Sequence, residues 1–135
     1  MKKRYFSLSQ AQSLLPEIRL LLEDLMKVQL AMHLKEGVTI AYDDPFLQTY
    51  EQLKHSAFYH KQSYKFVMLL KQLMKKGVFV KDPRIGLVDF YSKHKGKEIF
   101  LCYKYPEKTI EFWHSLDDGY QGRKHVSLLK EEIQK

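Results

Sequence analysis

The chain has 135 residues, of which 44% are hydrophobic and 29% charged, a balance typical of a soluble globular protein. This length predicts one domain over residues 1–135, and no apolar run approaches the roughly 20 residues of a membrane helix, which excludes a membrane span. The formal net charge of +7 is spread along the chain and therefore singles out no anionic partner.

The first predicted element is a helix that begins at Ser7. Ser7 and Gln10 have the spacing of a capping box, and Phe6 precedes the cap, where it can pack against Ala11. Apolar residues then recur at a spacing close to 3.5, which predicts one broad buried stripe. Because Pro16 interrupts this pattern, we expect a short helix that runs at a kink into a longer one.

A second helix is predicted after Gly37, which ends the first. Asp43 or Asp44 acts as N-cap before Pro45, and the helix is expected to run to Lys76 with Gly77 as its C-terminal cap. One edge of its apolar face is formed by Phe46, Tyr50, Leu53, Ala57, Tyr64, Val67 and Met74. Residues 1–77 are thus expected to form a long antiparallel helical hairpin with the pattern of a coiled coil.

After Gly77 the hydrophobic period changes to two, which indicates strands. The expected strands are Val78–Val80, Leu87–Tyr91, Glu98–Tyr105 and Thr109–His114, so residues 78–114 should form an antiparallel β-meander. Residues 115–135 are predicted to be a glycine-containing loop and a tail, with a short helix over Val126–Ile133. The fold class is therefore α+β, a helical hairpin followed by a small meander.

Several common classes of site are excluded. The sequence has no Walker loop, dinucleotide-binding glycine motif, Cys-x-x-Cys pair or Gly-x-Ser-x-Gly elbow, and His55 and His60 are five apart, so they diverge on a helix. The single cysteine, Cys102, lies in a strand-like run and is interpreted as a small buried apolar residue. No apolar leader follows the basic start of the chain, so the expected location is the cytoplasm.

Ionisable residues gather in the C-terminal half, and they are Lys81, Asp82, Asp89, His114, Asp117, Asp118 and Arg123. If the strands of the meander are neighbours, His114 could act as a base or metal ligand beside the carboxylates, and Arg123 could hold an anionic group. In the structural interpretation, Asp117-Asp118-Gly119 is a turn and an Asp–Arg pair fixes a loop. The residues alone identify no metal and no cofactor.

The sequence resembles a known family at both ends of the chain. The residues that carry the resemblance are Arg4-Tyr5-Phe6-Ser7-Leu8, Leu14-Leu15-Pro16, Gly77-Val78, Lys81-Asp82-Pro83, Gly86-Leu87-Val88-Asp89-Phe90, Leu101-Cys102, Glu107, Ile110, Trp113-His114, Gly119 and Gly122-Arg123. They are similar to those of DUF2203, a family of uncharacterised bacterial proteins. The resemblance implies a small cytoplasmic protein with a helical hairpin and a meander, and it assigns no activity, cofactor or partner.

Three functional hypotheses follow. The first is a non-enzymatic interaction module, because a small sheet leaves part of a long apolar stripe uncovered; a homodimer or a protein partner on the hairpin would cover it. The alternative is a small ligand-binding or metal-assisted hydrolytic domain that uses the Asp/His/Arg cluster. The third is nucleic-acid binding through the basic helix surfaces, which would weaken steeply with salt.

Overall fold

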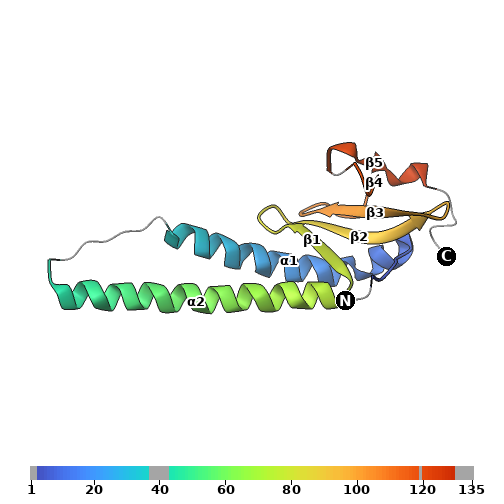
Figure 1. Ribbon diagram of the computed structural model, residues 1–135. Helices are drawn as coiled ribbons and strands as arrows, with labels where there is room; N and C mark the ends of the chain where they lie inside the picture. Colours follow the sequence, from blue (N-terminus) through green and yellow to red (C-terminus); the bar gives the residue numbers. More distant parts are fainter. Residues whose placement is uncertain (1–2, 37–42, 119, 130–135) are drawn as a thin grey trace.

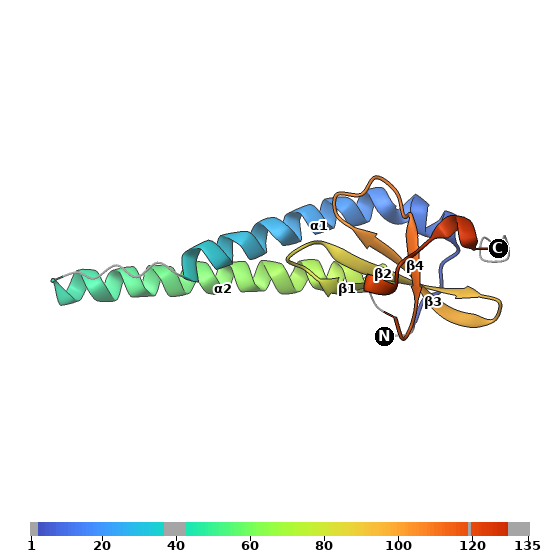
Figure 2. The same cartoon turned by 90° about the horizontal axis from the view of Figure 1, so that it is seen from above.

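The computed structural model describes residues 3–36, 43–118 and 120–129. Two long antiparallel helices lie against one face of a five-stranded antiparallel sheet, which confirms the predicted α+β class (Figure 1). The C-terminal part of α1 and the greater part of α2 project beyond the sheet, so the hairpin has a proximal part that carries the sheet and a distal part that does not (Figures 1 and 2). No helix in the described ranges is both long and apolar enough to cross a bilayer.

Helix α1 spans Leu8–Glu36 and begins with the predicted capping box. The Ser7 amide donates to Oε1 of Gln10 at 2.9 Å, and the Gln10 amide donates to Oγ of Ser7 at 3.1 Å. The expected division into a short and a longer helix is wrong, because α1 runs without a break through Pro16. Leu15 and Ile18 on either side are buried in one core, and this packing keeps the helix continuous although proline removes one backbone donor.

Helix α2 spans Pro45–Lys75, and its predicted ends are confirmed within one residue. Asp44, and not Asp43, is the N-cap, and its carboxylate accepts a hydrogen bond from the Phe46 amide at 2.8 Å. Lys76 is the C-cap, and Gly77 follows with φ +91°, a left-handed conformation that suits glycine. The prediction that Gly37 ends α1 lies outside the described residues.

The sheet is a meander in sequence order, and its strands are β1 (Val78–Asp82), β2 (Leu87–His94), β3 (Lys97–Lys104), β4 (Phe112–Ser115) and β5 (Lys124–His125). The predicted start of the fourth strand at Thr109 is wrong, because the Ile110 backbone pairs with the side-chain amide of Gln12 in α1, at 3.0 Å in both directions.

The C-terminal segment contains elements that the sequence did not predict. Strand β5 and a 3-10 turn, η1 (Tyr120–Gly122), lie in the stretch expected to be a loop, and η1 lies over the face of the sheet opposite the helices (Figure 1). In place of the expected helix over Val126–Ile133, the structure has a second 3-10 turn, η2 (Val126–Leu128); residues 130–135 lie outside the described part.

The two faces of the sheet have different environments. The inner face packs against α1 and α2 and forms the core with Val88, Phe90, Ile99, Leu101, Tyr103 and Trp113. Side chains alternate along strands, so the residues between these point to the opposite, outer face. On that outer face Asp89, Cys102 and His114 are also buried, and they form the candidate site.

Candidate functional site

The outer face of the sheet carries a buried pair of ionisable side chains. Asp89 on β2 and His114 on β4 are 0% and 1% exposed, and Nε2 of His114 lies 3.2 Å from Oδ1 of Asp89. The two residues come from strands on either side of β3, so their side chains meet above it, where the His114 ring also packs against Phe100 at 5.2 Å between centroids. The sequence prediction that Asp89 and His114 converge is therefore met.

The hydrogen bonds of His114 locate one of its protons. Its Nδ1 lies 2.8 Å from the backbone carbonyl of Ser115, which can only accept, so Nδ1 carries a hydrogen. Nε2 then faces the Asp89 carboxyl, and a proton must lie between these two atoms for a hydrogen bond to form there. The pair thus shares one proton, carried either as an imidazolium or as a carboxylic acid.

Two further side chains complete the cluster. Cys102 on β3 is directly opposite Asp89 in the ladder, and its Sγ lies within 4.8 Å of the Asp89 oxygen and the His114 nitrogen. Lys81 on β1 places Nζ 3.4 Å from Oδ2 of Asp89, and it is the member that reaches solvent, with 32% of its side chain exposed. Burial, and then the charge of Asp89, raises the pKa of the Cys102 thiol to about 12, so without a cation this sulfur is protonated and is a poor nucleophile.

Arg123 lies beside this cluster but is held by another residue. Its Nη2 donates to both carboxylate oxygens of Glu107, at 3.0 Å each, and its guanidinium stacks on Phe112 at 4.1 Å from the ring centroid. Phe112 is the ladder partner of Cys102, which brings Arg123 close enough for its charge to lower the pKa of the thiol slightly against the effect of burial. The geometry gives Arg123 a carboxylate partner within the chain, not an external anion.

The remaining predicted residues are not part of the cluster. Asp82 pairs with Arg84 in the β1–β2 turn, at 3.2 Å, and this hydrogen bond lowers the pKa of the carboxyl. Asp117 and Asp118 are exposed on the turn after β4. Asp118 packs against Gly122, where an added Cβ would lie 2.4 Å from the Asp118 Cβ, so here the turn interpretation describes the geometry best.

Sequence reasoning missed two participants, Cys102 and Glu107. Cys102 was interpreted as a small buried apolar residue, and it is buried, with 1% exposure, but its sulfur lies beside Asp89 and His114 on the outer face. A register signal could have found it: Lys95 and Gly96 both have positive φ, so they form a two-residue hairpin turn, and counting back from that turn places Cys102 opposite Asp89. Glu107 carries no such signal, because it lies in the loop between β3 and β4.

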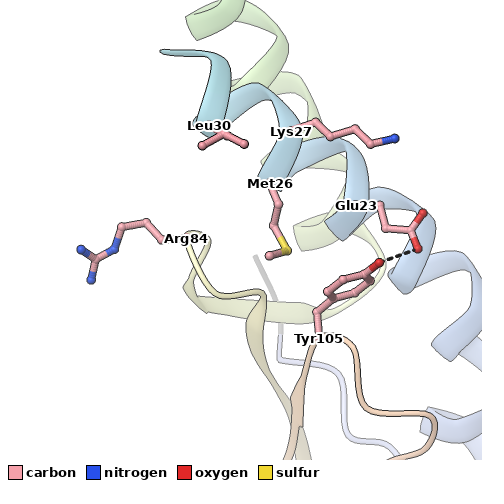
Figure 3. Close-up of a pocket in the computed structure, with 6 residues that line it drawn as sticks. All are labelled: Glu23, Met26, Lys27, Leu30, Arg84 and Tyr105. Carbon is pink, nitrogen blue, oxygen red and sulfur yellow. Dashed lines mark hydrogen bonds between the residues drawn. The ribbon is translucent and has the colours of Figure 1, made fainter. Parts of the chain in front are cut away.

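A separate pocket of about 440 Å³ lies at the junction of α1 and the sheet. Figure 3 shows its lining, with the Tyr105 hydroxyl donating to Glu23 at 3.0 Å and Met26 pointing toward the ring. The Arg84 guanidinium points away from the pocket (Figure 3). None of the six lining residues is fully buried, so the pocket is a surface hollow.

Helix α2 leaves an unusually apolar surface exposed along its length. Within α2, all of which the structure describes, Leu73 alone is fully buried. The predicted edge of its apolar face points to solvent: Phe46 is 87% exposed and Leu53 65%. The spacing alternates strictly between four and three over the positions Phe46, Tyr50, Leu53, Ala57, His60, Tyr64, Val67, Lys71 and Met74, all of them exposed. These nine residues are called the α2 stripe below.

Comparison with known proteins identifies a family and no activity. A family model described as an uncharacterized conserved protein, DUF2203, matches residues 4–126. No curated protein and no solved structure matches the chain. Asp89, Cys102, Glu107, His114 and Arg123 are among the residues that carried the resemblance in the sequence. The fold brings Asp89, Cys102 and His114 together on one face of the sheet and pairs Arg123 with Glu107.

Proposed function

We propose a function from the geometry alone, because the chain belongs to the DUF2203 family of uncharacterized conserved proteins and that membership assigns no activity: the protein is a non-enzymatic module that pairs with a second copy of itself along α2. The observation that carries the proposal is the exposed α2 stripe. Its alternating spacing of four and three is the heptad repeat that supports helix pairing, and all nine of its residues are exposed in the described part of the chain.

The size of the stripe supports a macromolecular partner. It extends over 28 residue steps, from Phe46 to Met74, which is about 42 Å of helix at 1.5 Å per residue. Seven of its nine residues are apolar or aromatic, the exceptions being His60 and Lys71, and large exposed apolar surfaces on soluble proteins usually mark interfaces. A helix of equal length is needed to cover it, and α2 of a second copy has that length and the matching repeat.

The charges beside the stripe favour a parallel pair. If Leu53 and Val67 take heptad position d, the flanking e positions include Lys54, Lys61 and Lys75, and the g positions include Thr49, Ser56 and Ser63. In a parallel pair each e position faces the g position five residues earlier on the other helix, so Lys54 meets Thr49 and Lys61 meets Ser56. An antiparallel pair sets e against e, which brings lysines together. The two sheets would then lie at the same end of the dimer.

The proposal includes a location in the cytoplasm. The buried free thiol of Cys102 is compatible with that reducing compartment.

The test compares two neighbouring substitutions in the full chain. Leu53→Glu places a carboxylate on the stripe, and Gln52→Glu places the same group on the adjacent exposed position off it. Burying a whole leucine side chain contributes about 1.5–3 kcal/mol, and about two-thirds of Leu53 is still available to be buried in the dimer. Losing this contact in both copies should weaken dimerisation by about 2–4 kcal/mol, which raises the dissociation constant roughly 30- to 1000-fold. Light scattering should give a dimer for the wild type and Gln52→Glu and a monomer for Leu53→Glu.

Orientation is tested by cysteine crosslinking. In a parallel pair Leu53→Cys meets its own copy and should form a disulfide-linked dimer on oxidation, and Gln52→Cys should not. Crosslinking of Leu53→Cys only with Val67→Cys, in a mixture of the two, would show antiparallel pairing instead. A wild-type chain that stays monomeric at micromolar concentration would refute self-association. In that case, binding to a heparin column that is lost as salt rises would favour the nucleic-acid alternative.

A further inference from the structure

We propose that Asp89, Cys102 and His114 form a binding site for a zinc-class divalent transition metal ion on the outer face of the sheet. This inference is independent of the proposed self-association, because the site lies on the sheet and the α2 stripe lies on the hairpin. The three ligand atoms come from three adjacent strands, are fully buried and lie within 4.8 Å of one another. Around a tetrahedral ion such atoms are about 3.3–3.6 Å apart, so modest side-chain rotations would close the site.

The surroundings of His114 match those of a metal ligand. Ligating histidines usually donate the other ring N–H to a carbonyl or carboxylate, which fixes the tautomer and aims the free nitrogen at the ion. Here Nδ1 donates to the Ser115 carbonyl at 2.8 Å, and Nε2 is aimed at Asp89 above Cys102. A cation bound here would take the place of the proton that Nε2 and Oδ1 now share.

Asp89 contributes a second sign of an incomplete site. Its Oδ2 is buried and accepts no hydrogen bond in the described part of the chain, although Lys81 Nζ lies 3.4 Å away. A buried carboxylate oxygen without a hydrogen bond is costly, and coordination is one way to satisfy it. With the ion on Oδ1, the Lys81 ammonium remains available to orient Oδ2 from the outer shell.

The donor set determines the class of metal. A thiolate and an imidazole favour zinc and similar borderline ions over magnesium and calcium, which prefer oxygen. Two anionic ligands would balance the two charges of the ion, and Glu107 would balance Arg123 alongside. Three protein ligands leave a fourth position open for water or another small ligand. Because a thiolate and not a thiol ligates the ion, binding releases the Cys102 proton and metal affinity should rise with pH.

The experiment uses the full chain, stripped with a chelator and then titrated with Zn²⁺ and with Co²⁺. We expect one equivalent of Zn²⁺ per chain, a rise in thermal stability on binding, and the near-ultraviolet absorption of a cobalt–thiolate bond with Co²⁺. His114→Gln should lose about a hundredfold or more in affinity. The matched control is His125→Gln on the neighbouring strand, an exposed histidine outside the cluster, which should bind like the wild type.

The wild-type measurement decides the proposal even if a variant does not fold. If the folded wild type takes up less than one equivalent at saturating Zn²⁺, or if Co²⁺ binds without thiolate absorption, the proposal is refuted and the three side chains form a protonated buried network. Equal zinc affinity in folded His114→Gln and His125→Gln would refute it as well. Neither result bears on the oligomeric state, so this proposal and the self-association fail independently.

Discussion

Substitution of two turn glycines by alanine separates steric fit from backbone conformation in this fold. Gly86 and Gly96 lie in the turns after β1 and β2, with φ of +68° and +76°, so alanine is strained at both positions. They differ in their surroundings: a Cβ on Gly86 would lie 2.6 Å from the Tyr105 Cβ and 2.9 Å from the Met26 sulfur, and a Cβ on Gly96 would meet nothing within 4 Å. Gly86→Ala therefore forces Tyr105 and the α1 side of the pocket in Figure 3 to move.

The two costs can be estimated separately. A left-handed conformation costs an L-residue about 1–2 kcal/mol, which sets the loss expected for Gly96→Ala. Overpacking adds about 1–3 kcal/mol, so Gly86→Ala should lose about 2–5 kcal/mol in free energy of unfolding. The assay is urea unfolding followed by the fluorescence of Trp113, the single tryptophan, which is buried in the core. Losses that agree within about 0.5 kcal/mol would refute the steric argument, since only backbone strain would then be at work.

Two further substitutions test the chemistry of single groups. Burial raises the pKa of the Cys102 thiol from 9.0 to about 12, so above pH 9 the unfolded state ionises first and the free energy of unfolding falls by up to about 1.4 kcal/mol per pH unit. Stability curves of wild type and Cys102→Ala should therefore approach each other or cross above about pH 9, between the two pKa values, in the metal-free protein. Curves that stay parallel there would contradict the assignment. Asp44→Ala removes the α2 N-cap and should lower the free energy of unfolding by about 1 kcal/mol, measured by thermal unfolding. The control, Asp43→Ala, should lower it by a few tenths of a kcal/mol at most. Equal losses would show that the cap hydrogen bond to Phe46 contributes nothing.

The elements that the sequence predicted best are those with local signals. The capping box at Ser7, the Asp44-Pro45 entry into α2 and the glycine at its end each involve residues within about one helical turn, so their interactions can be inferred without a fold. Pro16 was misjudged because its local effect on the helix is opposed by distant contacts. Leu15 and Ile18 are held by the sheet, and a sequence pattern does not report the strength of that packing.

The candidate site depended on interactions that the sequence does not display. Asp89 and His114 were expected to converge, but Cys102 joins them only because the β2–β3 register places it opposite Asp89 and turns it toward the outer face. For Arg123 the sequence left open an external anion or an aspartate that fixes a loop, and the carboxylate that it binds is Glu107, 16 residues earlier in the chain. These pairs are set by strand order and by the path of the C-terminal segment over the sheet.

The sequence by itself determined the two long helices, the change to a strand period after Gly77 and the heptad spacing of the α2 stripe, because helix and strand periods are properties of neighbouring residues. Only the tertiary structure decided which apolar edge stays exposed. Leu73, Phe66, Leu69 and Leu70 pack against the core, whereas the α2 stripe stays exposed from Phe46 to Met74, because burial depends on what else the chain can bring to a surface. The same principle applies to Asp89, Cys102 and His114, which lie far apart in sequence and meet because three strands lie side by side.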